Sequence, residues 1–181
     1  PDAGPQHMDW NPHAVVPRMS STVVAHERGV EAARWVLKRL EDGDLDRRLL
    51  LLEWVRLLLE RAPLIEPLGL KDILLRRASD PVAEVANKVT LCLAKAIEAD
   101  RDFGHQLALR LHEREETLVR RAMADVLTRL FRRLTWDALP LLDDMLTSDD
   151  EGVLAAASAT VGDVKYLDKE QWADRLRQLA D

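Results

Sequence analysis

From residue 23 onward, hydrophobic residues recur every three or four positions, which is the spacing of one face of an α-helix. The first helix is predicted over residues 22–41. Ser21 or Thr22 can cap its beginning, because a side-chain hydroxyl accepts a hydrogen bond from a free backbone amide there. Gly43 follows its last turn and is typical of a helix end.

A second helix is predicted to start at Asp44 or Asp46. It is expected to end near Ala62, because Pro63 follows and the residue before a proline is disfavoured in helical conformation. Proline at the first helical position loses no needed donor and marks helix starts. Further starts are predicted at Pro67, at Asp80-Pro81 and in the segment 135–137.

The hydrophobic pattern repeats with a period of 34 residues. One helix in each of four units carries core positions at i, i+4, i+7 and i+8, which share a single helical face. Fifteen of these sixteen positions are apolar. The four sets are Leu51, Val55, Leu58 and Leu59; Val85, Val89, Cys92 and Leu93; Val119, Met123, Val126 and Leu127; and Val153, Ala157, Thr160 and Val161. The preceding helices match more loosely, through Leu40, Leu74, Ala108 and Leu142.

This pattern predicts an all-α fold, a right-handed α-solenoid of about four helix pairs. A non-repetitive helical bundle is the alternative. We expect Asp168 to cap a last amphipathic helix that covers the end of the array and carries Trp172, Leu176 and Leu179. Two regions are expected: residues 1–22, a Pro-rich and partly irregular arm, and residues 23–181, the helical repeat domain.

Composition excludes several other classes of protein. Leucine occurs 32 times and isoleucine 3 times, and glycine only 7 times, which disfavours a β-sandwich or a Gly-rich nucleotide-binding fold. The single cysteine, Cys92, excludes an internal disulfide framework and suits a reducing compartment. No apolar run approaches the ~18 residues of a membrane span. We therefore predict a cytoplasmic protein with no membrane association.

Two short motifs carry a resemblance to a known class of repeats. Val119-Arg120-Arg121-Ala122 follows an acidic turn, and Asp80-Pro81 opens an earlier unit. With the paired helices, these features make residues 23–165 similar to the HEAT and armadillo-like α-helical repeats. The resemblance implies a solenoid whose second helices line a concave, partner-binding surface. The 34-residue length equals that of tetratricopeptide repeats, but the Trp, Gly-Tyr and Phe positions of that family are absent.

An acidic segment partly matches a calcium-binding loop. Residues 42–46 and Glu53 place carboxylates at positions 1, 3, 5 and 12 of such a loop. The sixth position is Arg47 where the sharp turn needs glycine, and Glu53 is predicted to lie within a continuous helix. We interpret the acids as helix-capping residues and expect no calcium site.

Histidine and tryptophan give little evidence of chemistry. His105 and His112 are seven residues apart, too far to meet one zinc ion without further ligands. Trp35, Trp54 and Trp136 are explained by helix packing, and Trp10 is expected to dock the N-terminal arm. No catalytic motif or cofactor fingerprint is present, so we expect no catalytic residue, no metal and no cofactor.

Charge is unevenly distributed along a chain of net charge -6. Residues 110–133 hold seven arginines and four acids, whereas residues 134–181 hold eleven acids and four bases. Cations near helix ends are ordinary, because they complement the helix dipole. The alternative is a surface for an acidic partner. The residues predicted to form it are Asn87, Lys95, Arg121, Arg129 and Arg132.

We therefore expect a non-catalytic protein–protein interaction scaffold or regulatory domain that binds a protein or peptide, with acidic groups, on its concave face. Two alternatives come from the same resemblance, since some HEAT-like proteins are DNA glycosylases and others are chromophore lyases or enzyme-associated subunits. The acidic C-terminal third makes nucleic acid a poor partner, because binding it requires a basic surface.

Overall fold

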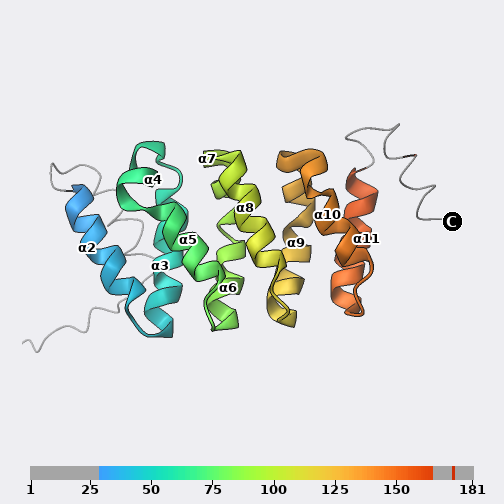
Figure 1. The fold of residues 1–181 in the computed structure, drawn as a ribbon, viewed down its shortest axis with the longest axis horizontal. Coiled ribbons are helices and arrows are strands. Elements are labelled where there is room, and N and C mark those ends of the chain that lie inside the picture. Colours follow the sequence, from blue (N-terminus) through green and yellow to red (C-terminus); the bar gives the residue numbers. More distant parts are fainter. Residues whose placement is uncertain (1–28, 165–172, 174–181) are drawn as a thin grey trace, which may run out of the picture. The chain divides into compact units, whose positions relative to one another are not determined.

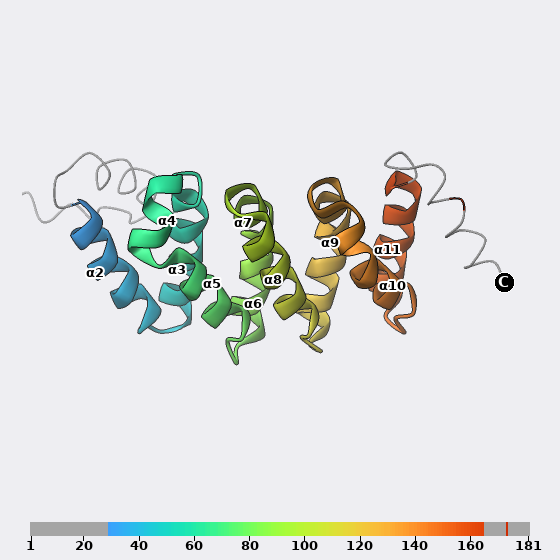
Figure 2. The ribbon, with the colours of Figure 1, turned by 45° about the horizontal axis from the view of Figure 1, so that its top comes forward.

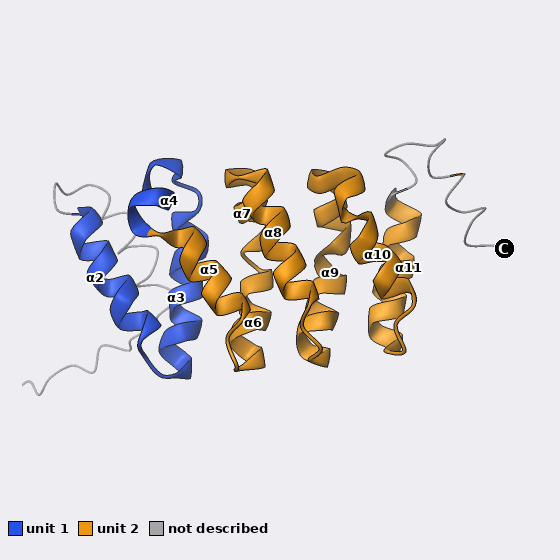
Figure 3. Cartoon of the chain, in the orientation of Figure 1, with its two compact units in different colours: residues 1–68 blue, residues 69–181 orange. Residues whose placement is uncertain are grey.

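The computed structural model describes residues 29–164 and Ala173, and this part of the chain consists of helices joined by short turns, with no strand (Figure 1). The all-α prediction is therefore confirmed for the described residues. The predicted N-terminal arm, the start of the first helix and the C-terminal helix lie outside them. The chain divides into two compact units, residues 1–68 and residues 69–181 (Figure 3).

The first unit contains α2 (Gly29–Glu41), α3 (Leu45–Leu58) and α4 (Ala62–Leu68). The α2 helix packs against both α3 and α4. Asp44 caps α3, because its carboxylate accepts a hydrogen bond from the Arg47 backbone amide at 3.1 Å. The predicted cap is thus confirmed, and the acidic segment serves to start a helix.

Two predicted boundaries in this region are wrong. The α3 helix ends at Leu58, not near Ala62, and Pro63 instead lies in the first turn of α4, where its missing amide costs nothing. Pro67 does not start a helix but lies inside α4. The next helix begins after Gly69, whose φ of 63° is a left-handed conformation that glycine adopts without strain.

The second unit contains α5 (Leu70–Ala78), α6 (Ala83–Thr90), α7 (Leu93–Ala99) and α8 (Arg101–His112), then α9 (Thr117–Leu134), a 3₁₀ turn η1 (Thr135–Ala138), α10 (Leu139–Leu146) and α11 (Glu151–Val164). The α5, α8 and α10 helices each pack against the helix that completes their pair, respectively α6, α9 and α11. The α6, α9 and α11 helices lie side by side within this unit (Figure 2).

The predicted repeating face is buried. Leu51, Val85, Val119 and Val153 are each 0% exposed. The last three are the third residues of α6, α9 and α11, whereas Leu51 lies further along α3. Of the sixteen predicted core positions, fifteen are buried and only Val161 is partly exposed. Leu40, on the looser preceding helices, is also partly exposed.

One predicted helix is divided into two. The helix that carries Val85 and Val89 stops at Thr90, and α7 begins at Leu93. The Thr90 hydroxyl donates to the Asn87 carbonyl at 2.7 Å, and the Cys92 amide donates to the Val89 carbonyl at 2.8 Å, three residues back. Such local bonds compete with the α-helical pattern and tighten the backbone into a turn. Cys92 and Leu93 stay buried despite the interruption.

Several side-chain bonds join residues about one repeat apart. Arg34 in the first unit donates to the Pro67 carbonyl, 33 residues ahead, at 2.6 Å. In the second unit Arg101 donates to the Leu134 carbonyl, also 33 residues ahead, at 2.9 Å. The Thr128 and Thr160 hydroxyls, 32 residues apart, share a hydrogen bond of 2.9 Å between α9 and α11. These three polar contacts therefore span 32 or 33 residues, close to the 34-residue spacing of the hydrophobic pattern.

The burial pattern leads to a matched pair of substitutions. Val119→Asp places a carboxylate at a fully buried position with no partner, and we expect the free energy of unfolding to fall by about 3 kcal/mol or more. Leu118→Asp makes the same kind of change one residue earlier, where the side chain is 45% exposed, and should have little effect. Chemical denaturation followed by circular dichroism measures both. Equal losses at the two positions would reject the assigned helix face.

Candidate partner-binding surface

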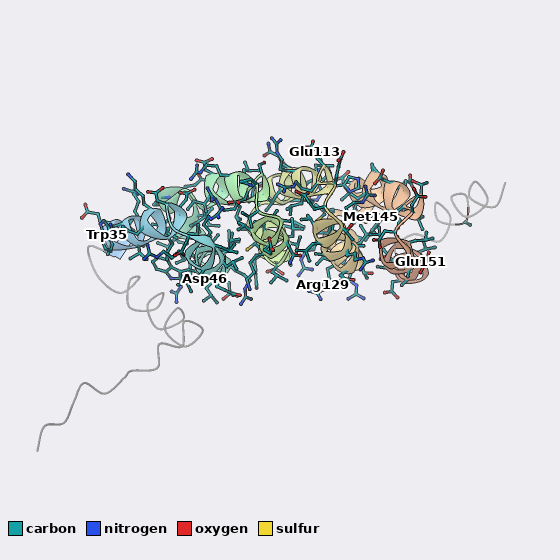
Figure 4. The ribbon with its side chains drawn as sticks, turned by 90° about the horizontal axis from the view of Figure 1, so that it is seen from below. Trp35, Asp46, Glu113, Arg129, Met145 and Glu151 are labelled. Carbon is teal, nitrogen blue, oxygen red and sulfur yellow. The ribbon has the colours of Figure 1, made fainter. Side chains whose placement is uncertain are left out.

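The α9 helix presents its charged residues on the side away from the core. Its buried side includes Val119, Met123 and Leu130, which pack within the second unit. Arg121, Asp125, Arg129 and Arg132 are exposed. Figure 4 shows Arg129 of α9 on the opposite side of this unit from Glu113, which follows α8. The helix therefore holds three guanidinium groups along one exposed face, with a single carboxylate among them.

The structure places two of the predicted surface residues differently from the other three. Asn87 is partly buried on α6. Lys95 lies on α7, beyond the interruption that the sequence did not indicate, and forms an ion pair with Glu98 at 3.2 Å. These two residues therefore lie on α6 and α7, whereas Arg121, Arg129 and Arg132 lie on α9.

Glu98 links Lys95 to the end of α9. It accepts a charge-assisted hydrogen bond from Arg133 as well as its ion pair with Lys95. The hydrogen bonds from Arg133 and Lys95 lower the pKa of Glu98 below its ordinary value. The carboxylate therefore stays ionised and offsets the charge of Lys95, which weakens Lys95 as a site for an acidic partner.

Arg121 contacts the beginning of α11. Its Nε atom donates to both carboxylate oxygens of Asp150, at 3.0 and 3.2 Å. The same Asp150 Oδ1 accepts from the backbone amides of Gly152 and Val153, at 2.9 and 3.0 Å. The Arg121 hydrogen bond is the main cause that lowers the pKa of Asp150, and Asp150 in turn raises the pKa of Arg121. Arg121 is thus a contact between α9 and α11 as well as an exposed cation.

Arg129 and Arg132 are the least engaged cations of the predicted set. Both are exposed on the last two turns of α9, three residues apart, so they project from adjacent turns of one face. Within the described part of the chain, neither forms an ion pair. Their guanidinium groups are therefore open to a carboxylate from outside, which they can bind through two parallel hydrogen bonds.

Exposed leucines were missed by the sequence reasoning. Leu91, which follows α6, is 51% exposed, and Leu118, in the first turn of α9, is 45% exposed. In a leucine-rich chain, nothing distinguishes such residues from core leucines. They add exposed apolar area to the same second unit.

The interpretation of Trp35 by helix packing is wrong. Trp35 is 64% exposed on α2, and the Arg39 guanidinium lies 5.4 Å from the centre of its ring. Trp54 is buried at 2% exposure, in agreement with the packing interpretation. Trp136 is partly exposed in the 3₁₀ turn η1, and Trp10 lies outside the described residues.

His112 has a structural setting that the sequence did not reveal. Its Nε2 atom lies 3.3 Å from an Asp144 carboxylate oxygen, which also lies 3.4 Å from Arg120. Burial is the main cause that lowers the pKa of His112, while Asp144 acts in the opposite direction. These residues connect α8, α9 and α10. Within the described residues, no group of three or more His, Cys, Asp or Glu side chains could hold a metal ion.

Arg114 joins the two turns that precede α6 and α9. Its Nη1 atom donates to the carbonyl oxygens of Ala78 and Asp80, at 3.2 and 2.8 Å. Its other nitrogens donate to Glu116. Glu113, Arg114, Glu115 and Glu116 line an open depression here. Arg114 therefore uses its hydrogen-bonding groups for contacts within the chain.

None of the helices in the described part is long and apolar enough to cross a membrane.

The Arg114–Glu116 contact generates a prediction for pH dependence. The hydrogen bond from Arg114 lowers the pKa of Glu116 to about 2. The pair therefore stabilises the fold above the ordinary pKa of glutamate, and this contribution is lost as the pH falls from 4.5 towards 2. In Arg114→Gln the pKa of Glu116 should return towards 4.5, which carboxyl NMR titration measures. An unchanged titration would show that Arg114 does not bind this carboxylate in solution.

Arg121 and Arg129 should differ when their charge is reversed. Arg121→Glu places a carboxylate beside Asp150 and should lower the thermal midpoint, because it replaces an ion pair by repulsion. Arg129→Glu removes no described ion pair and should leave the midpoint nearly unchanged. Thermal unfolding followed by circular dichroism compares them, and loss of the difference at high salt would confirm its electrostatic origin.

Comparison with known proteins concerns the fold. No protein-family model and no curated protein matches the chain. Two engineered proteins with crystal structures from the Northeast Structural Genomics Consortium resemble it. One has a TM-score of 0.50 at 14% identity, over 87% of this chain and 75% of its own length. The other has a TM-score of 0.50 at 16% identity, over 83% of this chain and 43% of its own. The chain is thus similar to engineered proteins in its fold.

Proposed function

We propose that this chain is a non-catalytic interaction scaffold of the HEAT-like class, which binds an acidic segment of a protein partner on the exposed side of its second helices. The exposed pair Arg129 and Arg132 carries the proposal. Two guanidinium groups on adjacent turns of one rigid helix suit carboxylates spaced along a peptide. Leu91 and Leu118 add apolar area in the same unit.

The helix pairs support the scaffold part of this proposal. Equivalent core positions recur every 34 residues, and side-chain bonds join residues 32 to 35 apart. Such repetition is typical of α-solenoids, whose exposed helix faces form extended binding surfaces. His112, Arg114 and Glu98 each contact a residue of another helix or turn in the described structure. These contacts support a structural role for the three groups.

The neighbouring charges favour a protein over nucleic acid. Asp125 lies between Arg121 and Arg129 on the exposed side of α9. Glu151, also exposed, begins α11, which packs against α9. The affinity for nucleic acid rises with the number of phosphates that cations neutralise. Carboxylates between the arginines repel phosphate and therefore lower this affinity. A peptide can instead place its acids at the two open guanidinium groups and avoid Asp125. Charge complementarity of this kind determines specificity and the rate of association.

A photo-crosslinking experiment tests which side of the second unit binds the partner. Benzoylphenylalanine at position 125, on the exposed face of α9, should crosslink to the partner in native extract. The same residue at position 109, an exposed leucine of α8, should not. Mass spectrometry identifies the product. Crosslinking from position 109 alone would move the interface to the other layer of helices.

Charge reversal then tests the arginine pair with the purified partner. Arg129→Glu with Arg132→Glu should weaken binding by about tenfold or more, because two charge-assisted contacts become repulsive. Lys38→Glu with Arg47→Glu makes the same change in charge at exposed positions of the first unit and should have little effect. Calorimetric titration at two salt concentrations measures both. Equal weakening by both pairs, or tight salt-sensitive binding of a DNA duplex by the parent chain, would contradict the proposal.

A further inference from the structure

The exposed side chains of α9 lie in one straight row along the helix. After Thr117, the exposed residues of α9 are Leu118, Arg121, Asp125, Arg129 and Arg132, here called the α9 row. They are three, four, four and three positions apart in the sequence. At about 3.6 residues per turn, this spacing keeps them within about 80° of the helix circumference. A rise of about 1.5 Å per residue makes the row about 21 Å long.

Neighbouring helices cover the rest of α9. It packs against α6, α7, α8, α10 and α11 (Figure 2). The remaining side chains of α9 beyond Thr117 are buried or partly buried, and Val119 and Leu130 are examples of the buried ones. The α9 row is therefore the part of this helix that the described structure leaves accessible to a partner.

The charged groups of the α9 row can bind further groups. Among the described residues, none forms an ion pair with Asp125, Arg129 or Arg132. Arg121 donates to Asp150 through its Nε atom, and its side chain is 58% exposed. A guanidinium group also has two terminal nitrogens with hydrogen atoms to donate. Arg121 can therefore bind a second carboxylate while it keeps its contact with α11.

The spacing of the α9 row fits a helix better than an extended peptide. On one face of a partner helix, residues three or four apart rise by about 4.5 or 6 Å, and these are the steps along α9 itself. An extended peptide places the side chains of one face about 6.6 Å apart, so four such steps cover about 26 Å. Its last residue would therefore lie about 5 Å out of register with the row.

We infer that the α9 row binds an amphipathic helix of the partner whose residues complement the row in order. The inference rests on the proposed function and adds the conformation and the residue order of the acidic segment. The partner helix presents an acid to each arginine, a lysine or arginine to Asp125, and an apolar residue to Leu118. It lies antiparallel to α9, because the acids opposite Arg129 and Arg132 then fall in its first turns and favour its own helix dipole.

Asp125 gives the α9 row its selectivity. A partner helix with acids at every contacting position would place a carboxylate against Asp125, and like charges in an interface repel each other. A helix with one cation at this position gains an ion pair there instead. The row therefore distinguishes partner helices by the order of their charges, and net charge alone does not determine binding.

Synthetic peptides test the conformation and the charge order with the full chain. The matched peptide is an alanine-rich helix that carries, from its N-terminus, Glu, Glu, Lys, Glu and Leu at spacings of three, four, four and three positions. One control distributes the same residues around the helix. A second control keeps the matched order and contains D-alanines, which disfavour a right-handed helix. Calorimetric titration should show binding that is weaker by about tenfold or more for both controls.

Charge exchange tests the contact of Asp125. The parent chain should prefer the matched peptide to one with Glu in place of its Lys. Asp125→Lys should reverse this preference and change the ratio of the two affinities by about fivefold or more. Asp102→Lys makes the same substitution at an exposed position of α8 and should leave the preference unchanged. Circular dichroism checks that both variants are folded.

Three outcomes would overturn the inference: no binding of the matched peptide, equal binding of either control, or an unchanged preference in Asp125→Lys. The proposed function is tested separately, by the response of the purified partner to Arg129→Glu with Arg132→Glu. If the partner responds but the peptides do not discriminate, its acidic segment binds in another conformation and the inference alone fails. If the partner does not respond, the proposed function and the inference fail together.

Discussion

The fold depends on one constraint: the helices of the described structure carry apolar sides that neighbouring helices cover. Four residues illustrate the constraint, because they share one position of the 34-residue pattern and are all fully buried: Leu51, Val85, Val119 and Val153. None of these helices would be stable in isolation, because short helices are only marginally stable in water and need tertiary packing. This packing determines where the charged residues, the turns and the exposed helix faces lie.

The same constraint explains how much the sequence could predict. Helical periodicity identified the buried sides because burial requires apolar residues at regular positions, and Asp44 signalled a helix start through its local hydrogen bond. The division between α6 and α7 could not be predicted, since it arises from local hydrogen bonds of the Thr90 hydroxyl and the Cys92 amide that leave the apolar pattern unchanged. The exposure of Trp35 escaped prediction because a tryptophan favours packing on average.

The candidate surface was predicted in its residue types more than in its arrangement. The count of charged residues identified the basic stretch around α9. The formation of ion pairs, however, depends on the distances between residues that are far apart in the sequence. Arg121 meets Asp150, 29 residues away, and Glu98 connects Lys95 with Arg133. Such contacts distinguish the cations that form ion pairs within the chain from those that can bind a partner. Arg129 and Arg132 belong to the second group in the described structure.

The bonds of Arg34 and Arg101 each connect residues that are 33 positions apart in the sequence. Each arginine reaches a backbone carbonyl 33 residues further along, near the end of a later helix. A carbonyl is present at every residue, so the acceptor tolerates any side chain, yet its position depends on every residue between. Substitutions within the interval leave the bond possible, whereas an insertion or deletion carries the acceptor away from the donor. These two bonds therefore tolerate a change of residue type within the interval better than a change in the length of the interval.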